Sequence, residues 1–418
     1  MRRHAALLSA ALALLLTAGC SQRERANPFD PRNPQTGGRP TGFNAVAGLS
    51  VVQLSWDKRS DLAIDGFQLY RRTSSDSLWR PLGALLPPEA GQYLDSAVRN
   101  GERIRYRLVF VAHGQPVGGP AEDEATPGPL RPWIADPGAG AVLRLSPDGR
   151  DVTIRETRFG AAGRIAVDSF DGFLWASSNT TGLVWASDPG SPFPISIPGI
   201  SSPDAIAIHP FDHSAWVCDR AGAVFHFRRD GSVPSPGRIT PLDDPVAIAT
   251  CALDASLWVC ERGGNRVRHF SALGVPLGAA FVRAPTRIAV DSLTRVAYVT
   301  SFELGRLWRI AENGTPIDSS AAAIAPIGIA IDRPRGRVWV ADDGGARLLG
   351  LSLETLAVEV TVTNAGIPYD VAVDRSSGEV WVVARSDGAV VRLAPDGRRL
   401  DVRTGFTDPV EVRLDPGQ

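Results

Sequence analysis

The sequence predicts an all-β protein in which a small β-sandwich is followed by a seven-bladed β-propeller that the C-terminal strand closes. Three observations predict this fold class. Short runs of alternating apolar and polar residues, separated by turn residues, fill the first part of the chain. Beyond Arg131, aromatic residues recur every 40 to 42 residues. Asp-Gly and Asn-Gly pairs, which favour hairpin turns, recur within the repeated units.

The first element is a secretion signal over residues 1–19, where a basic start precedes the apolar run from Ala5 to Leu16. This run is too short to span a bilayer, which needs roughly 20 residues. The following Ala-Gly-Cys resembles the lipobox of bacterial lipoproteins, which implies lipidation of Cys20. Ser21 after that cysteine implies the outer membrane of a Gram-negative cell. The alternative is ordinary cleavage near Gly19 and a soluble secreted product.

Residues 20–40 are expected to form a flexible tether because this stretch is polar and rich in Pro and Gly. The chain has a net charge of -1, whereas a surface that binds nucleic acid without sequence preference needs a basic excess. Nucleic acid is therefore excluded as a partner. A closed ring leaves no long sheet edge exposed, so we expect a monomer.

Residues 41–127 carry the alternating runs and predict a sandwich of two sheets. The runs Val52 to Trp56 and Gly66 to Arg72 resemble strands of a fibronectin type III domain. The resemblance implies that Trp56 and Tyr70 lie in the core. It also implies a role as a spacer or adhesive module.

One aromatic residue marks each of seven units within residues 128–418. These aromatics are Trp133, Trp175, Trp216, Trp258, Tyr298, Trp339 and Trp381. Because they recur in every unit, we interpret them as core between blades and not as a platform for sugars. Six units place a strand of the Ile-Ala-Val-Asp type before the aromatic. The unit of Trp133 lacks this strand, and Asp408 to Asp415 match it in phase, so the C-terminus is expected to complete the first blade.

The units resemble NHL and YVTN-type propeller repeats over residues 128–418. The resemblance implies the fold, whereas propellers host lyases, lactonases, dehydrogenases and binding platforms alike. Propellers of the streptogramin-lyase type set His and Glu side chains on the channel face. Glu261 lies in a comparable setting here, but Gly263 follows it and no His joins it. The partner needed for proton transfer is missing, which favours a non-enzymatic protein.

The candidate site consists of positions that differ between blades, because a ring of repeats holds one asymmetric site only where its repeats differ. Acidic residues occupy the third position after four of the aromatics, and charged residues enter four of the inner strands. The candidate ligand-binding residues are Arg164, Asp219, Glu261, Arg287, Asp342, Asp370, Glu411 and Arg413, with Asp136 on the same rim. Such a rim suits a polar ligand held by Arg. The alternative is that these residues are solvated strand ends and turn caps.

No cofactor is predicted, and a divalent cation such as Ca²⁺ stays an alternative, with Asp219 and Glu261 as candidate metal ligands. His209 and His213 also invite a metal interpretation. They fall at a turn on the face opposite the candidate site, which argues against it.

Three cysteines follow Cys20. The repeat places Cys218 and Cys260 at a position for small buried side chains, where they act as small hydrophobes. Equivalent positions in neighbouring blades are too far apart for a disulfide, whereas a bridge from Cys251 to either of them stays open.

These observations together favour an envelope-anchored binding or scaffold lipoprotein that presents one propeller face to a protein or glycan ligand. The lipid on Cys20 would hold it to the membrane. The alternative is a metal-assisted lyase or hydrolase acting at the channel mouth.

Overall fold

The computed structural model describes residues 27–33, 36–47, 51–60, 62–73, 76, 78–99, 102–125, 127–128, 130–168, 172–188, 191, 194–375 and 377–415. The predicted signal, 1–19, and Cys20 lie outside the described residues. Within them every element is a β-strand except three single-turn 3-10 helices: η1 (Pro137–Ala139), η2 (Arg333–Arg335) and η3 (Arg385–Asp387). None of these helices has the length or the apolar character to cross a bilayer. The all-β prediction is therefore confirmed.

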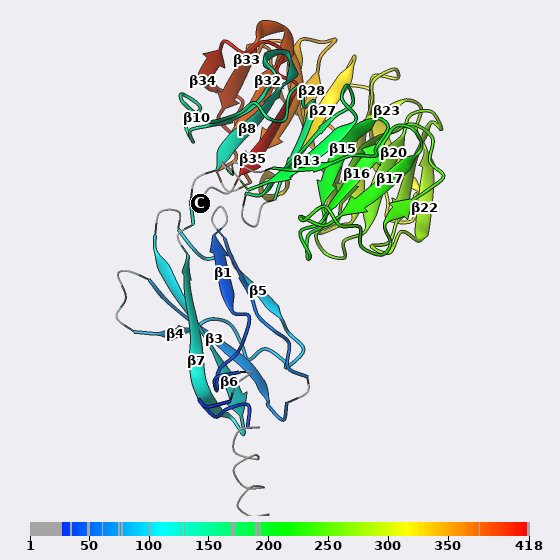
Figure 1. Cartoon of the computed structure of the whole chain (residues 1–418). Coiled ribbons are helices and arrows are strands. Elements are labelled where there is room, and N and C mark those ends of the chain that lie inside the picture. The colour runs from blue at the N-terminus through cyan, green and yellow to red at the C-terminus, as the bar shows by residue number, and fades with distance from the viewer. Residues whose placement is uncertain are drawn as a thin grey trace, which may run out of the picture. The chain divides into compact units, whose positions relative to one another are not determined.

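The chain divides into two compact units, and the second begins at Leu130. The first unit contains a three-stranded sheet, in the order β1-β2-β5, and a four-stranded sheet, in the order β4-β3-β6-β7. Its strands are β1 (Asn44–Ala47), β2 (Val52–Ser55), β3 (Gly66–Thr73), β4 (Arg80–Pro81), β5 (Gln92–Asp95), β6 (Ile104–Ala112) and β7 (Gln115–Ala125). Figure 1 shows these strands in blue and cyan.

One hydrophobic cluster fills the first unit and takes side chains from both sheets. Trp56 lies in it, as expected. Tyr70 is only half-buried, because β3 alternates and turns Phe67 and Leu69 inward instead. The tyrosine that lies in the core is Tyr106 on β6, whose hydroxyl donates to Asp95 at 3.0 Å.

Part of the expected tether differs from the prediction, because the described residues between 27 and 40 form turns on the first unit. Phe29 packs edge-on against Phe110, with ring centroids 5.5 Å apart. The Thr36 hydroxyl donates to the Pro28 carbonyl at 2.6 Å, and the Gly119 N–H donates to the Gly38 carbonyl. One aromatic anchor and a set of side-chain caps thus order a stretch whose overall composition is that of a linker.

The second unit consists, in its described residues, of seven four-stranded antiparallel sheets. The first strands are β11 (Arg164–Val167), β15 (Pro203–Ile208), β19 (Pro245–Thr250), β23 (Pro285–Asp291), β27 (Pro326–Asp332), β31 (Pro368–Val373) and β35 (Glu411–Asp415). The second strands, which carry the recurring aromatics, are β8 (Arg131–Asp136), β12 (Leu174–Ser178), β16 (Ala215–Asp219), β20 (Leu257–Glu261), β24 (Val296–Ser301), β28 (Arg337–Asp342) and β32 (Val380–Ala384).

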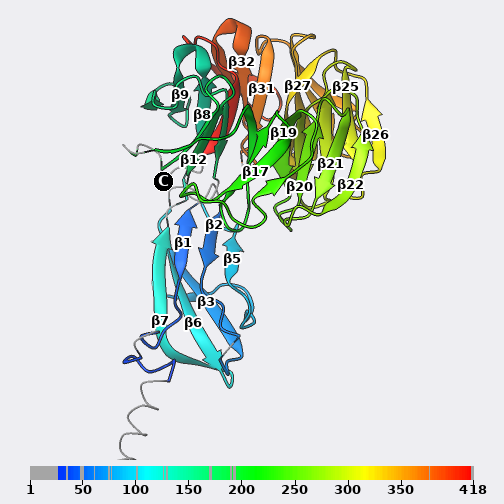
Figure 2. The same cartoon turned by 45° about the vertical axis from the view of Figure 1, so that its right-hand side comes forward.

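The outer half of each sheet is a further hairpin. The third strands are β9 (Ala141–Leu145), β13 (Leu183–Ser187), β17 (Ala223–Phe227), β21 (Arg266–Phe270), β25 (Arg306–Ile310), β29 (Arg347–Ser352) and β33 (Ala389–Leu393). The fourth strands are β10 (Val152–Glu156), β14 (Ile195–Ile197), β18 (Arg238–Ile239), β22 (Pro276–Phe281), β26 (Pro316–Ser320), β30 (Val358–Val362) and β34 (Arg399–Thr404). Figure 2 shows the sheets following one another from teal through green and yellow to orange.

The first strands form the inside of a closed ring. Each contacts the first strand of the next sheet from β11 to β31, and β35 contacts both β31 and β11. The C-terminal strand β35 pairs with β8 through Glu411 opposite Ala135 and Asp415 opposite Arg131, as predicted. Figure 1 shows red β35 beside teal β8. Both ends of this unit therefore meet in one sheet.

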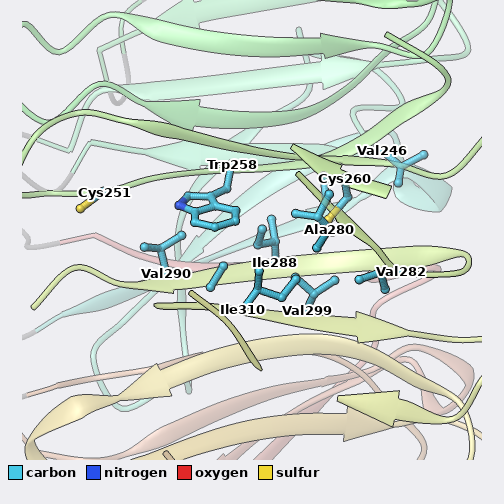
Figure 3. Packing of buried hydrophobic residues seen from close by; sticks show 13 residues of the cluster. Val246, Cys251, Trp258, Cys260, Ala280, Val282, Ile288, Val290, Val299 and Ile310 are labelled. Carbon is cyan, nitrogen blue, oxygen red and sulfur yellow. The ribbon is translucent and has the colours of Figure 1, made fainter. Parts of the chain in front are cut away.

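The recurring aromatics pack between sheets, which confirms their interpretation as core. Trp258 is fully buried in a cluster that joins the sheet of β19 to the sheet of β23. Figure 3 shows Trp258 facing Ile288 and Val290 across that contact, with Cys251 and Cys260 on opposite sides of the indole. Among the described residues Cys218, Cys251 and Cys260 are all free thiols.

Candidate functional site

The strand order gives the ring two different faces. The inner strands begin at one end, and the loops between second and third strands lie at the same end, because consecutive strands are antiparallel. We call this end the mouth face. It carries all of the candidate residues except Arg413, which lies further along β35.

The acidic residues that end the second strands are buried and bind backbone N–H groups of the mouth-face loops. The Asp219 carboxylate accepts from Ser202 N at 2.9 Å and from Ala221 N at 3.1 Å. Asp342 accepts from Ile324 N at 2.8 Å and from Ala325 N at 2.9 Å. These carboxylates therefore hold the loop that leads into the inner strand of their own sheet.

Two more members of this set do the same. Asp136 accepts from Thr407 N at 2.9 Å and from Asp408 N at 2.8 Å, and thereby fixes the chain before β35. Glu261 accepts from Asp243 N at 2.8 Å and pairs with Arg266 at 2.8 Å. The alternative stated from the sequence, solvated strand ends and turn caps, is therefore half right for these acids: they cap turns, but they are buried and not solvated.

Three sheets have no acid at this position, where Ser178, Ser301 and Ala384 stand, and the last of them shows how general the role is. Ala384 ends β32, and Asp387 from η3 supplies the carboxylate instead, accepting from Ile367 N at 3.0 Å. A carboxylate three residues further along the chain thus replaces the strand-end acid as the acceptor of the loop N–H. The recurrence argues that the strand-end acids stabilise the mouth-face loops.

The candidate metal ligands do not converge on one point. The described residues contain no group of three or more His, Cys, Asp or Glu side chains placed to hold a metal ion. On the opposite face, His213 pairs with Asp168 at 3.0 Å and His209 with Asp212 at 2.9 Å. The carboxylates of Asp219 and Glu261 already accept backbone N–H groups, so the structure gives the calcium alternative no coordination set within its described part.

The charged residues of the inner strands form a second group. On four neighbouring inner strands, β31, β35, β11 and β15, these side chains form a network of ion pairs and hydrogen bonds. Arg413 on β35 binds Asp370 on β31 at 3.0 Å and also pairs with Glu411. Glu411 reaches the next sheet and accepts from Ile165 N on β11 at 2.6 Å. Arg413 stands where the other six units have Ala, and its two acidic partners explain the exception.

The network continues through a residue that the sequence analysis missed. Arg164 on β11 donates through Nε to Asp204 on β15 at 2.7 Å. Asp204 is buried, and its column holds Val246, Ile327 or another uncharged residue in the other sheets. Comparing this neighbouring column between units was the signal that could have revealed it.

Electrostatics in this network follows from burial opposed by charge pairing. Burial alone lowers the pKa of Arg164, but Asp204 and Glu411 raise it above its ordinary value. The pKa of Arg413 is likewise raised, because Glu411 and Asp370 outweigh the loss of solvent. Both guanidinium groups are therefore positively charged at any physiological pH.

Arg287 on β23 is different from every other charged inner-strand residue. Only 8% of its surface is accessible, and its Nε and Nη2 atoms have no hydrogen-bond partner. Burial lowers the pKa of its guanidinium, and Arg164 lowers it further, while Glu411, Asp370 and Asp204 act in the opposite direction. No carboxylate in the described structure forms an ion pair with it.

The structure thus separates the predicted site residues into three arrangements. Asp219, Glu261 and Asp342 cap loops. Arg164, Asp370, Glu411 and Arg413 form the inner-strand network with Asp204. Arg287 stands alone. Whether any of them binds a ligand stays a prediction at this point.

No protein-family model and no curated protein matches the chain. Solved structures do. Virginiamycin B lyase from Staphylococcus aureus shares 16% identity at a TM-score of 0.50, covering 58% of this chain and 84% of its own. A streptogramin B lyase shares 16% identity at a TM-score of 0.50, and the match covers 67% of this chain and 90% of the lyase. At these identities the likeness shows the fold alone, which is a β-propeller.

Proposed function

We propose that the chain is an exported, lipid-anchored envelope protein that binds a protein or glycan ligand at the mouth face of a seven-bladed propeller and catalyses no reaction. In this proposal residues 1–19 are the signal and Cys20 carries the lipid. Residues 41–127 are a fibronectin type III-like spacer, and residues 128–418 are the propeller of NHL or YVTN type. The two compact units and the seven four-stranded sheets of the described chain support this division.

One observation carries the binding proposal: the inner strands differ in charge where the rest of the repeat is regular. The recurring aromatics are buried in all seven sheets, as a structural position requires. Arg164, Arg287 and Arg413, by contrast, each occur in one or two sheets, near the axis of the ring. Polar groups that converge at one place on a repetitive scaffold are the ordinary mark of a ligand site.

The same residues argue against catalysis. Asp204, Asp370 and Glu411 are each held by an arginine, and Glu411 also accepts a backbone N–H. A general acid or base needs a carboxyl or imidazole group free to exchange a proton with the substrate. Within the described inner strands these three carboxylates have no such freedom, and His209 lies at the opposite end of the ring.

Site-specific photocrosslinking in intact cells tests the mouth face as the binding surface. A photoreactive residue at Glu303, in the exposed loop between β24 and β25, is expected to capture the ligand. The matched control is Leu273, in an exposed turn between β21 and β22 at the other end of the sheets. Equal yields at Glu303 and Leu273 would contradict the proposal.

The anchor has its own test. Cells fed labelled palmitate are expected to label the wild-type chain and not a Cys20→Ser variant. Recovery of unlabelled wild-type protein in the medium would support the secreted alternative.

A further inference from the structure

The guanidinium of Arg287 is a buried positive charge that forms no ion pair within the described residues. It lies on β23, between inner strands β19 and β27, and two of its nitrogens are buried without a partner. Removing a charged group from water is costly unless an opposite charge or hydrogen bonds replace the solvent. The other two inner-strand arginines, Arg164 and Arg413, have such replacements. Among the described residues, Arg287 has no such replacement at these two nitrogens.

The strands on either side of Arg287 contribute only small residues at its level. At the equivalent position β19 carries Ala247 and β27 carries Gly328, so neither flanking strand projects a long side chain. Two residues further along the same strands Ala249, Ala289 and Ala330 are half-buried, so solvent reaches the inside of the ring beyond Arg287, toward the opposite face. The guanidinium itself keeps a small accessible surface.

The acids of the ring cannot fill this role by a small side-chain movement. Asp370 accepts from Val412 N at 3.0 Å in addition to Arg413, and Glu411 accepts from Ile165 N. Asp204 already accepts a hydrogen bond from Arg164. Turning any of them toward Arg287 would break bonds inside the network and leave another buried group unpaired.

We propose that Arg287 binds an oxyanion of the ligand, a carboxylate or a phosphate group that enters from the mouth face. A guanidinium presents parallel N–H donors that match two oxygens of either group, and the bond is strongest where water is excluded. This inference rests on the proposed function, since it assumes a ligand at the mouth face, and it adds the chemical class that the site selects. Neutral ligands would leave the charge unmatched.

The proposal has a consequence for stability that a structural role would reverse. If Arg287 held the ring together, replacing it would lower the melting temperature. Because it is a buried charge kept for a ligand, an apolar side chain of similar length is expected to raise the melting temperature in the absence of anions.

The test compares four proteins: wild type, Arg287→Met, Arg287→Lys and the control Arg283→Met. Arg283 is an exposed arginine on the same face, paired with Glu303 at 3.2 Å. Thermal unfolding is followed in inorganic phosphate, in acetate and in sodium chloride at equal ionic strength. Binding to the folded state raises the melting temperature with anion concentration.

We expect phosphate or acetate to stabilise wild type and Arg283→Met beyond the chloride control. The affinity of Arg287→Met should be at least about tenfold weaker, and Arg287→Lys should lie between, since an ammonium lacks the paired donors. The anion that raises the melting temperature more identifies the oxyanion of the ligand as a phosphate or a carboxylate.

Three results would overturn the inference: no stabilisation of wild type beyond chloride, equal stabilisation of Arg287→Met, or a melting temperature of Arg287→Met below wild type without anions. The two proposals fail separately. Anion binding through Arg287 together with equal crosslinking at Glu303 and Leu273 would contradict the mouth face as the partner surface. Selective crosslinking that survives in Arg287→Met would contradict only the oxyanion inference.

Discussion

The two halves of the inner ring use charge in opposite ways. Apart from Asp415 at the end of β35, strands β31, β35, β11 and β15 carry three acids and two arginines, and every one of these side chains has a partner. Apart from Asp291 and Asp332 at their ends, strands β19, β23 and β27 carry one charged residue, the unpaired Arg287. The scaffold is the same on both sides. The difference therefore comes from a few side chains and not from the backbone.

This contrast separates charges that stabilise the ring through ion pairs from Arg287, which we propose binds a ligand. In the paired half, the ion pairs of Arg413 with Asp370 and of Arg164 with Asp204 join neighbouring sheets, and Glu411 binds Ile165 N of the next sheet, so these contacts reinforce the place where β35 closes the ring. In the other half, the sheets are joined by packing, as around Trp258 in Figure 3, and by ion pairs of loop arginines such as Arg333 with Asp291. A buried charge without a hydrogen-bonding or ion-pair partner is a functional candidate.

The largest expected effect is in the paired half. Glu411→Ala removes the acceptor of Ile165 N and one partner of Arg413. Breaking a buried, hydrogen-bonded pair typically costs about 3–5 kcal/mol, and we expect a loss of this size in urea unfolding. Glu411→Gln, which keeps an acceptor oxygen, should lose less. A loss below about 0.5 kcal/mol for Glu411→Ala would erase the distinction between the halves.

A smaller loss is expected at the strand ends. Asp219→Ala leaves the N–H groups of Ser202 and Ala221 without their acceptor. Loss of a comparable cap costs about 0.5–2 kcal/mol. Metal analysis by mass spectrometry should give the same content for Asp219→Ala, Glu261→Ala and wild type. A stoichiometric ion that either substitution removes would instead favour the metal-assisted alternative.

The sign of the change reverses in the unpaired half. Arg287→Met is expected to stabilise the folded protein in urea by about 1 kcal/mol, the scale of stabilising substitutions at functional positions. A destabilisation of similar size would mean that Arg287 belongs to the scaffold after all.

The smallest effect is expected outside the ring interior. Arg283→Met removes an exposed ion pair with Glu303. Exposed pairs contribute between about 0 and 1 kcal/mol, so the free energy of unfolding should change little in either direction. A change as large as that of Glu411→Ala would show that surface charge, and not burial, controls the stability of the ring.

The recurring features of this chain could be predicted from its sequence, because each repeat tests the others. The aromatic positions and the pairing of β35 with β8 follow from phase alone. Features that occur once had no such support. The ordering of residues near Phe29 depends on a contact with Phe110, and the ion pair of Asp204 with Arg164 depends on which columns face each other across neighbouring inner strands.

The candidate site shows the same limit. The sequence placed Asp219, Glu261 and Asp342 beside Arg287 as equals, since all four are charged residues on one face. Their difference lies in the backbone N–H groups that loops bring to the acids, and in the absence of any acceptor at Nε and Nη2 of Arg287. Hydrogen-bond partners supplied by the backbone leave no mark in the sequence.

The most direct test of the account is a crystal structure of the protein soaked in selenate, an oxyanion that anomalous scattering locates without ambiguity. The account predicts an anomalous peak inside the ring, within hydrogen-bond distance of the Arg287 guanidinium, that is absent from crystals of Arg287→Met. Selenate found only on exposed arginines, with the space beside Arg287 filled by ordered water alone, would contradict it.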